Sequence, residues 1–191
     1  MSLFEVIAVI ISVIAVVLTI KRHLLCWPFN FLSYVLYAIL FFDFKLYGES
    51  ILQFFFMALA IYGYLQWKKG LDEQHELVVS HIKISTGIYQ LILTSGMGLM
   101  FGALLAWFTD AAVPWLDSQL AAFSLLATYW TSKKYISTWS LWVIVDIIYV
   151  GMFVFKSLYL TAALYAAFVV LAAMGWMQWR KAYLQQLSHK F

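Results

Sequence analysis

Charged residues are scarce in this sequence. Asp, Glu, Lys and Arg make up only 11% of the 191 residues, whereas 65% are hydrophobic and 19% are aromatic. Soluble domains are nearer one quarter charged and one half apolar, so this composition excludes a soluble globular domain and indicates a membrane protein. The net charge of +3 does not indicate nucleic-acid binding, because the Lys and Arg residues lie at the ends of apolar runs.

Several chemical motifs are missing as well. Cys26 is the single cysteine, which excludes an intramolecular disulfide framework. The sequence has no HExxH or GxSxG motif and no paired carboxylates deep within an apolar run, which argues against an enzyme. The histidines fall between apolar runs or in the tail without metal-ligand spacing, so we expect no metal and no cofactor; they are His23, His75, His81 and His189.

Apolar runs dominate what remains. A transmembrane helix needs about 20 apolar residues, and the first run, from Leu3 to Ile20, has neither a preceding basic residue nor a cleavage pattern, so it predicts a retained helix. The sequence predicts an all-α integral membrane protein with seven transmembrane helices, at about residues 3–20, 27–42, 49–67, 86–108, 116–132, 139–155 and 158–179.

The basic residues are distributed unevenly among the linkers. Ten of them fall in the first set of alternate linkers or in the tail, whereas the opposite set has only Lys45 and Lys156. By the positive-inside rule, the N-terminus should be outside and the C-terminus in the cytoplasm. The aromatic residues at helix ends, including Trp67, Trp115 and Trp179, are expected to lie in the interfacial belt, together with Tyr183. The ten basic residues are Lys21, Arg22, Lys68, Lys69, Lys83, Lys133, Lys134, Arg180, Lys181 and Lys190.

The chain contains an internal repeat. When residues 27–69 are laid on residues 139–181, a shift of 112 positions, thirteen of the 43 positions are identical. The repeat predicts two parallel three-helix units joined by a linker helix, a 3+1+3 arrangement like that of SWEET transporters, which bind substrate between the repeats near the membrane midplane. The expected divisions are a first repeat at 1–69, a cytoplasmic loop plus linker helix at 70–112, a second repeat at 113–182 and a cytoplasmic tail at 183–191.

One predicted helix carries a polar and aromatic stripe. Trp139, Trp142, Asp146 and Tyr149 stand at i, i+3, i+7 and i+10, which places them on one face. An Asp at a helix centre costs about 2.5–3.5 kcal/mol on insertion scales, and no predicted span has a Lys or Arg at that depth to pair with it. A bound organic cation would supply the charge, and aromatic rings attract cations by about 0.5–2 kcal/mol. The alternative is a carboxylate that pairs with another helix, or stays neutral, for packing alone.

The first repeat offers a matching face with different side chains. The equivalent positions are Trp27, Asn30, Tyr34 and Tyr37, and Ser33 lies beside them. Gln53 is the other deep polar residue, and an interhelical hydrogen bond is an equally good explanation for it. The two faces together predict two walls of one asymmetric cavity.

The stretch "WSLWVIVD" resembles the WxxWxxxN/D signature of the PnuC family of bacterial vitamin transporters, and "LYGESILQFFFMALAIYGYLQW" and "LYLTAALYAAFVVLAAMGWMQW" are similar to that family's third and seventh helices. The resemblance implies a facilitator that equilibrates an unphosphorylated vitamin across the bacterial inner membrane, while a cytoplasmic kinase traps the product; it allows a homotrimer. The absence of a GxxxxGK[ST] loop agrees that the chain does not hydrolyse ATP. The resemblance also adds Tyr165, at the repeat position of Gln53, to the cavity residues.

The substrate follows less directly. Family members carry nicotinamide riboside, thiamine, riboflavin or deoxynucleosides, and by resemblance the nicotinamide riboside carriers have Asn where this chain has Asp146 and Ala60. An ionised carboxylate cannot donate to the nicotinamide carbonyl but suits the aminopyrimidine of thiamine, so thiamine is favoured and nicotinamide riboside is the alternative. A proton-coupled carrier that uses Asp146 is a further alternative, as is a subunit without transport activity.

Overall fold

The computed structural model describes residues 3–43, 47–70, 77–108, 113–155, 157 and 159–188. Within these residues the chain forms seven helices, and their predicted limits agree with the structure to within two residues except at the end of the last helix. The helices are α1 (Leu3–Ile20), α2 (Cys26–Asp43), α3 (Tyr47–Lys69), α4 (Ile84–Phe108), α5 (Pro114–Ser132), α6 (Ser137–Phe155) and α7 (Tyr159–Ser188).

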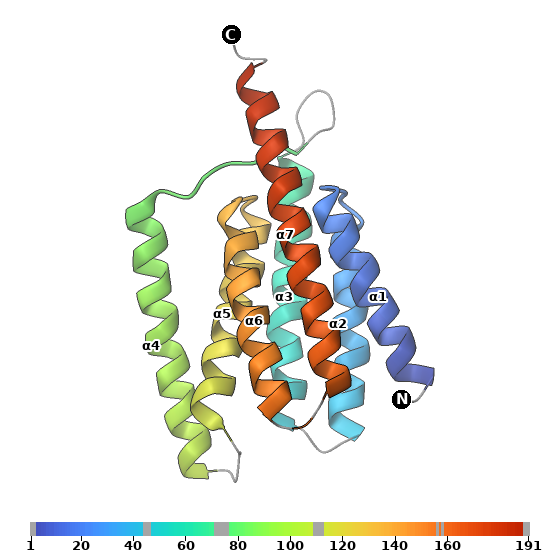
Figure 1. The fold of residues 1–191 in the computed structure, drawn as a ribbon, viewed down its shortest axis with the longest axis vertical. Coiled ribbons are helices and arrows are strands. Elements are labelled where there is room, and N and C mark those ends of the chain that lie inside the picture. Colours follow the sequence, from blue (N-terminus) through green and yellow to red (C-terminus); the bar gives the residue numbers. More distant parts are fainter. Residues whose placement is uncertain are drawn as a thin grey trace.

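Six of the seven helices are long and apolar enough to cross a membrane. The exception is α5, because many of its buried side chains are hydroxyls, including Ser124, Thr128 and Thr131. Thr128 donates to the Ser124 carbonyl and Thr131 to the Ala127 carbonyl, each at 2.9 Å, so their polarity is satisfied within the helix. The α5 helix contacts α3, α4 and α6 and runs alongside the other helices (Figure 1), so its polar side chains face protein.

The helices form a ring of six with one helix outside it. Neighbours around the ring are α1, α2, α3, α5, α6 and α7, and α7 closes the ring against α1. Among the described residues, α4 packs closely only on α5 and lies at the edge of the molecule (Figure 1). The α3–α5 and α7–α1 contacts are the same contact made twice, since each joins the third helix of one repeat to the first helix of the other. The predicted 3+1+3 fold is therefore confirmed.

The peripheral α4 helix approaches α5 through glycines. Gly98 and Gly102 form a GxxxG pair, a spacing that lets two membrane helices pack closely. A Cβ on Gly98 would lie 2.9 Å from the side chain of Gln119, and one on Gly102 would lie 2.9 Å from the Trp115 ring. The Gln119 amide also donates to the Ser95 carbonyl at 2.9 Å, which ties the two helices together.

The two repeats also have the same backbone conformation where their first helices, α1 and α5, end. Arg22 (φ 57°) follows α1 and Lys134 (φ 62°) follows α5, both in the left-handed region. In each turn one N–H bonds back five residues, from His23 to Leu18 and from Tyr135 to Trp130, a Schellman-type helix end. Two sequences that share few residues here thus form the same turn, which indicates that the repeat is structural.

One end of the ring collects the described basic linker residues. The turns after α1 and α5, the C-terminal end of α3 and the start of α4 all lie at the end from which α7 and the C-terminus project, opposite to the N-terminus (Figure 1). We call this the basic end. Lys45, Lys156 and Lys190, which also entered the charge count, lie outside the described residues.

A short extended segment crosses the basic end, and we call residues 77–81 the strap. The Ser80 N–H donates to the Lys134 carbonyl, and the Ile136 N–H donates to the Ser80 carbonyl, both at 3.0 Å. The Leu77 carbonyl accepts from the Arg22 guanidinium at 3.2 Å. Leu77 and Val79 are buried in the core cluster beneath. The strap thereby joins both repeats.

The strap also explains why α7 is longer than predicted. The helix was expected to end near residue 179, yet it continues to Ser188. Beyond that point Gln186 donates to the Leu77 carbonyl at 3.3 Å, and the ring of Tyr183 meets His81 edge-on at 4.7 Å. These contacts stabilise two further turns that the hydropathy of the sequence did not indicate.

Candidate functional site

Four tryptophans form a cluster at the basic end of the ring, which we call the tryptophan cluster. Trp27, Trp67, Trp139 and Trp179 come from α2, α3, α6 and α7 and are all buried. Trp27 meets Trp67 edge-on at 5.4 Å, and Trp139 meets Trp179 in the same way at 5.4 Å. Trp67 and Trp179 lie 6.0 Å apart, so the two repeats touch through these rings.

Two members of the cluster hold the repeats together by hydrogen bonds. The Trp67 indole N–H donates to the Thr131 carbonyl at 3.0 Å, and the Trp179 indole N–H donates to the Thr19 carbonyl at 3.2 Å. These bonds cross the two equivalent ring contacts. The expectation that Trp67 and Trp179 lie in the interfacial belt is therefore wrong, because both are 0% exposed. Trp115, in contrast, is 48% exposed.

The predicted stripe on α6 faces into the ring. Trp139 and Asp146 are buried and Trp142 and Tyr149 are partly buried, whereas Ile144 and Ile147 on the opposite side are exposed. Asp146 is only 5% exposed. Within the described part of the chain, no hydrogen bond or salt bridge reaches its carboxylate. The acid is thus buried without a cationic partner among the residues that the structure describes.

An aromatic group from α6 and α7 lies beyond Asp146 along α6. The rings of Tyr149 and Tyr165 are 4.7 Å apart, and Phe153 lies 5.1 Å from Tyr165. Tyr37 of the first repeat is partly buried on α2, where its ring stacks on Phe41 at 5.8 Å.

The candidate residues of the first repeat lie on α2 and α3. The Tyr34 hydroxyl donates to the Asn30 amide oxygen at 3.5 Å, and its ring stacks on Phe56 at 5.1 Å. Tyr34 occupies the repeat position of Asp146, which makes the two walls chemically different. Ser33 and Gln53 are buried on α2 and α3, but among the described residues neither forms a hydrogen bond with another candidate.

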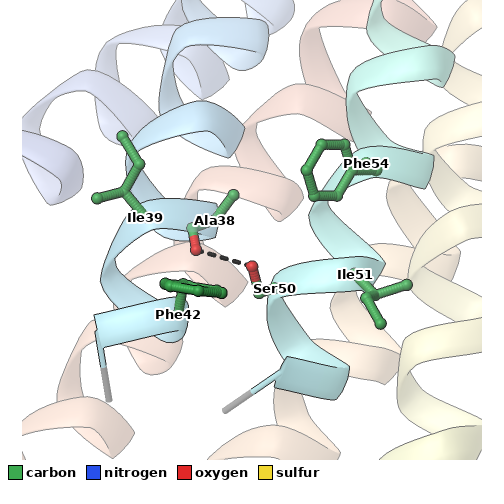
Figure 2. A pocket seen from close by; sticks show the side chains of 6 residues that line it. All are labelled: Ala38, Ile39, Phe42, Ser50, Ile51 and Phe54. Atoms are coloured by element: carbon green, nitrogen blue, oxygen red, sulfur yellow. Dashed lines mark hydrogen bonds between the residues drawn. The ribbon is translucent and has the colours of Figure 1, made fainter. Parts of the chain in front are cut away.

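Surface grooves lie elsewhere. A groove of about 450 Å³ between α2 and α3 is lined by exposed apolar side chains, and the Ser50 hydroxyl at its floor donates to the Ala38 carbonyl at 2.9 Å (Figure 2). A second groove of about 310 Å³ separates α6 from α7 beside Ser140 and Trp176. Neither groove contains Asp146 or any other candidate residue. The first groove is lined by Ala38, Ile39, Phe42, Ser50, Ile51 and Phe54.

The arrangement is suited to enclosing a small organic cation. It offers one buried carboxylate, several aromatic faces and a few neutral polar groups. The described residues contain no group of three or more His, Cys, Asp or Glu that could hold a metal.

Comparison with known proteins identifies the family. The family model described as "Nicotinamide mononucleotide transporter" matches residues 2–181, which is nearly the whole chain. The chain belongs to this family. It is thus a multi-pass inner-membrane vitamin transporter of the PnuC type, as the tryptophan motif indicated, and the family consists of transporters, not enzymes.

Individual PnuC relatives are distant but cover most of the chain. The nicotinamide riboside transporter PnuC of Escherichia coli (strain K12) is 25% identical over 218 residues, which cover 99% of this chain and 91% of that protein. The riboflavin/roseoflavin transporter RibM of Streptomyces davaonensis is 26% identical over 174 residues, 89% of this chain and 81% of that protein. A crystal structure of the vitamin B3 transporter PnuC shares the fold, with a TM-score of 0.78, 22% identity and coverage of 95% of this chain and 82% of that chain.

Sequence reasoning anticipated only part of the tryptophan cluster. Trp27 was placed on the first-repeat face opposite Trp139, but Trp67 and Trp179 were expected elsewhere, although the repeat contained the signal. Trp27 matches Trp139, and Trp67 matches Trp179, at the shift of 112 positions, and Gly63 and Gly175 beneath the rings match as well.

Proposed function

We propose that this protein is a facilitated-diffusion transporter of an unphosphorylated, cationic vitamin, with thiamine as the first candidate. The observation that carries the proposal is Asp146, buried inside the ring without a protein cation among the described residues. An isolated charge is costly to bury, so a permanently cationic substrate would compensate it. Thiamine carries that charge on its thiazolium ring, and its aminopyrimidine offers donors to a carboxylate.

The binding site in this proposal uses the residues of both walls. Trp139, Trp142 and Asp146 form its centre, with Gln53 and Tyr165 as further lining residues. Aromatic faces would stack on the heterocycles and attract the cation. Asn30, Ser33, Tyr34, Tyr37 and Tyr149 complete the proposed site from the helical faces beside these residues.

Nicotinamide riboside is the second candidate, because the first relative named above transports it and it is also a cation. Riboflavin, the substrate in the name of RibM, is neutral and would leave the Asp146 charge uncompensated. The order of affinities among the three vitamins therefore tests the proposal. Calorimetric titration of the purified protein should give the tightest binding for thiamine, then nicotinamide riboside, then riboflavin. Tightest binding of riboflavin would contradict a cation site.

The proposed transport is passive. Uptake in the cell would be driven by a separate cytoplasmic kinase that phosphorylates the vitamin, and each protomer of a homotrimer would work alone. In liposomes without kinase, labelled vitamin should equilibrate but not accumulate, whether or not a pH gradient is imposed. Accumulation driven by a pH gradient would instead support a proton-coupled carrier in which Asp146 takes up the proton.

A further inference from the structure

The two pairs of clustered tryptophans differ in one respect. Trp67 and Trp179 donate their indole N–H groups across the repeat contacts. Trp27 and Trp139 are equally buried, yet their indole nitrogens have no hydrogen-bond partner among the described residues. The difference follows the repeat, since the two bonded tryptophans are equivalent to each other and the two unbonded tryptophans are likewise equivalent.

An unpaired donor in the interior is unfavourable. Burying an N–H group without an acceptor loses its hydrogen bonds to water and gains nothing in return, and most buried polar groups in native structures are paired. The described residues contain one further buried side-chain atom without a partner, the hydroxyl of Ser118. Two of these three unpaired atoms therefore belong to equivalent residues of the repeat, which argues against an accidental packing defect.

The backbone holds both free indoles in place. A Cβ on Gly63 would overlap the Trp27 ring, and one on Gly175 would overlap the Trp139 ring. Each ring is also fixed edge-on by its neighbour in the tryptophan cluster, Trp67 or Trp179. Both donors are thus positioned in advance, which reduces the entropy lost when an acceptor binds.

We propose that Trp27 is a further substrate-binding residue, which donates its indole N–H to an uncharged acceptor of the transported vitamin just as Trp139 does from the second repeat. This rests on the proposed function, in which Trp139 already contacts the substrate. A neutral N–H donor suits a hydroxyl oxygen or a ring nitrogen, and thiamine and nicotinamide riboside both carry hydroxyls. The site would then bind the vitamin through one donor from each repeat and through Asp146 from the second repeat only.

The test compares two equal truncations in the first repeat. Trp27→Phe removes a free N–H, whereas Trp67→Phe removes an N–H that is already bonded to the Thr131 carbonyl. Both replace a buried indole by a smaller ring, so cavity effects are matched. Affinity for thiamine and for nicotinamide riboside is measured by calorimetry, and stability by the thermal midpoint, in the same detergent.

We expect Trp27→Phe to weaken binding of the transported vitamin about tenfold, as for one lost hydrogen bond, and Trp139→Phe to do likewise. Trp67→Phe should lower the thermal midpoint further than Trp27→Phe while leaving affinity near that of the parent. If Trp27→Phe does not fold, an isosteric benzothiophene side chain at position 27, which lacks the N–H, should give the same loss of affinity.

Two results would overturn the inference in distinguishable ways. Parental affinity in the Trp27 variant, with a loss in the Trp139 variant, would remove Trp27 from the site and leave the proposed function standing. A parent protein that binds neither vitamin would contradict the proposed function itself, and the role of Trp27 with it.

Discussion

Two glycines decide where the free indoles can lie. Gly63 and Gly175 pack directly under Trp27 and Trp139, whereas Gly96 and Gly151, also in helices, face open space. Alanine is the better helix former by about 1 kcal/mol when nothing else changes. The same substitution should therefore have opposite effects at the two kinds of position.

We expect Gly63→Ala and Gly175→Ala to lower the free energy of unfolding by about 1–3 kcal/mol, because each Cβ forces a buried ring to move. Gly96→Ala should leave stability unchanged or raise it by up to about 1 kcal/mol. Thermal unfolding followed by near-UV circular dichroism would rank the variants. Equal stability of Gly63→Ala and Gly96→Ala would contradict the packing described for the tryptophan cluster.

At the residue scale, helical periodicity correctly predicted one side of α6, whereas position at a helix end gave a wrong prediction for two tryptophans. Trp139, Trp142, Asp146 and Tyr149 were predicted to share a face, and that face is turned into the ring. Trp67 and Trp179 were predicted at the membrane interface, because a tryptophan beside Lys or Arg at a helix end usually lies there. These two tryptophans are distinguished from interfacial ones by their indole hydrogen bonds to Thr131 and Thr19. Those partners lie 64 and 160 residues away along the chain.

At the element scale, the strap is the feature with the clearest consequence for transport. Leu77 and Val79 belong to the same buried cluster as the tryptophans of both repeats, and we expect the strap to obstruct the basic end while it is in place. A substrate that leaves through this end requires the strap to move. Ser80 and Tyr135 are paired in a parallel bridge, and such neighbours lie within reach of a disulfide.

We expect the double variant Ser80→Cys, Tyr135→Cys to stop transport into liposomes under oxidising conditions and to regain it when a reductant is added. Cys26 is buried and should not interfere. The two single-cysteine variants are the controls, and a gel shift with a thiol reagent reports how much disulfide has formed. Unchanged transport by the fully cross-linked protein would show that the strap stays in place during the transport cycle.

Hydropathy located the helices but could not locate the strap. The strap residues, Leu-Val-Val-Ser-His, form a run too short to show a helical period or a membrane span, and their partners come from the turns after α1 and α5. Other contacts of the strap, from Leu77 to Gln186 and from His81 to Tyr183, accompany the extension of α7 to Ser188. Contacts between segments that are far apart in the chain decide both features, and no local pattern encodes such contacts.

At the scale of the whole molecule, the charge distribution predicts an orientation. The described basic linker residues gather at the end from which α7 projects (Figure 1), so this end should face the cytoplasm and the N-terminus should face outside. A fluorescent protein fused to the C-terminus should fluoresce in cells, and alkaline phosphatase fused there should be inactive. Active phosphatase at the C-terminus would reverse the orientation.

The whole molecule is also symmetric in fold and asymmetric in chemistry. The repeat sets the same ring contacts, helix ends and tryptophan pairs twice, and it was readable from the sequence as a shift of 112 positions. At one pair of equivalent positions, however, the first repeat has Tyr34 and the second repeat has Asp146. The second repeat alone therefore supplies the buried charge on which the proposed substrate class depends.

The most direct measurement is a calorimetric titration of Asp146→Asn with thiamine and nicotinamide riboside, beside the parent protein and Asp43→Asn as a control. Asp43 lies exposed at the end of α2, so its variant loses an equal charge away from the site. We predict that Asp146→Asn loses thiamine binding by about 100-fold, as for a buried charge-assisted contact, while Asp43→Asn binds like the parent. Tight vitamin binding that is indifferent to Asp146→Asn would contradict the central claim that the buried acid compensates the substrate's charge.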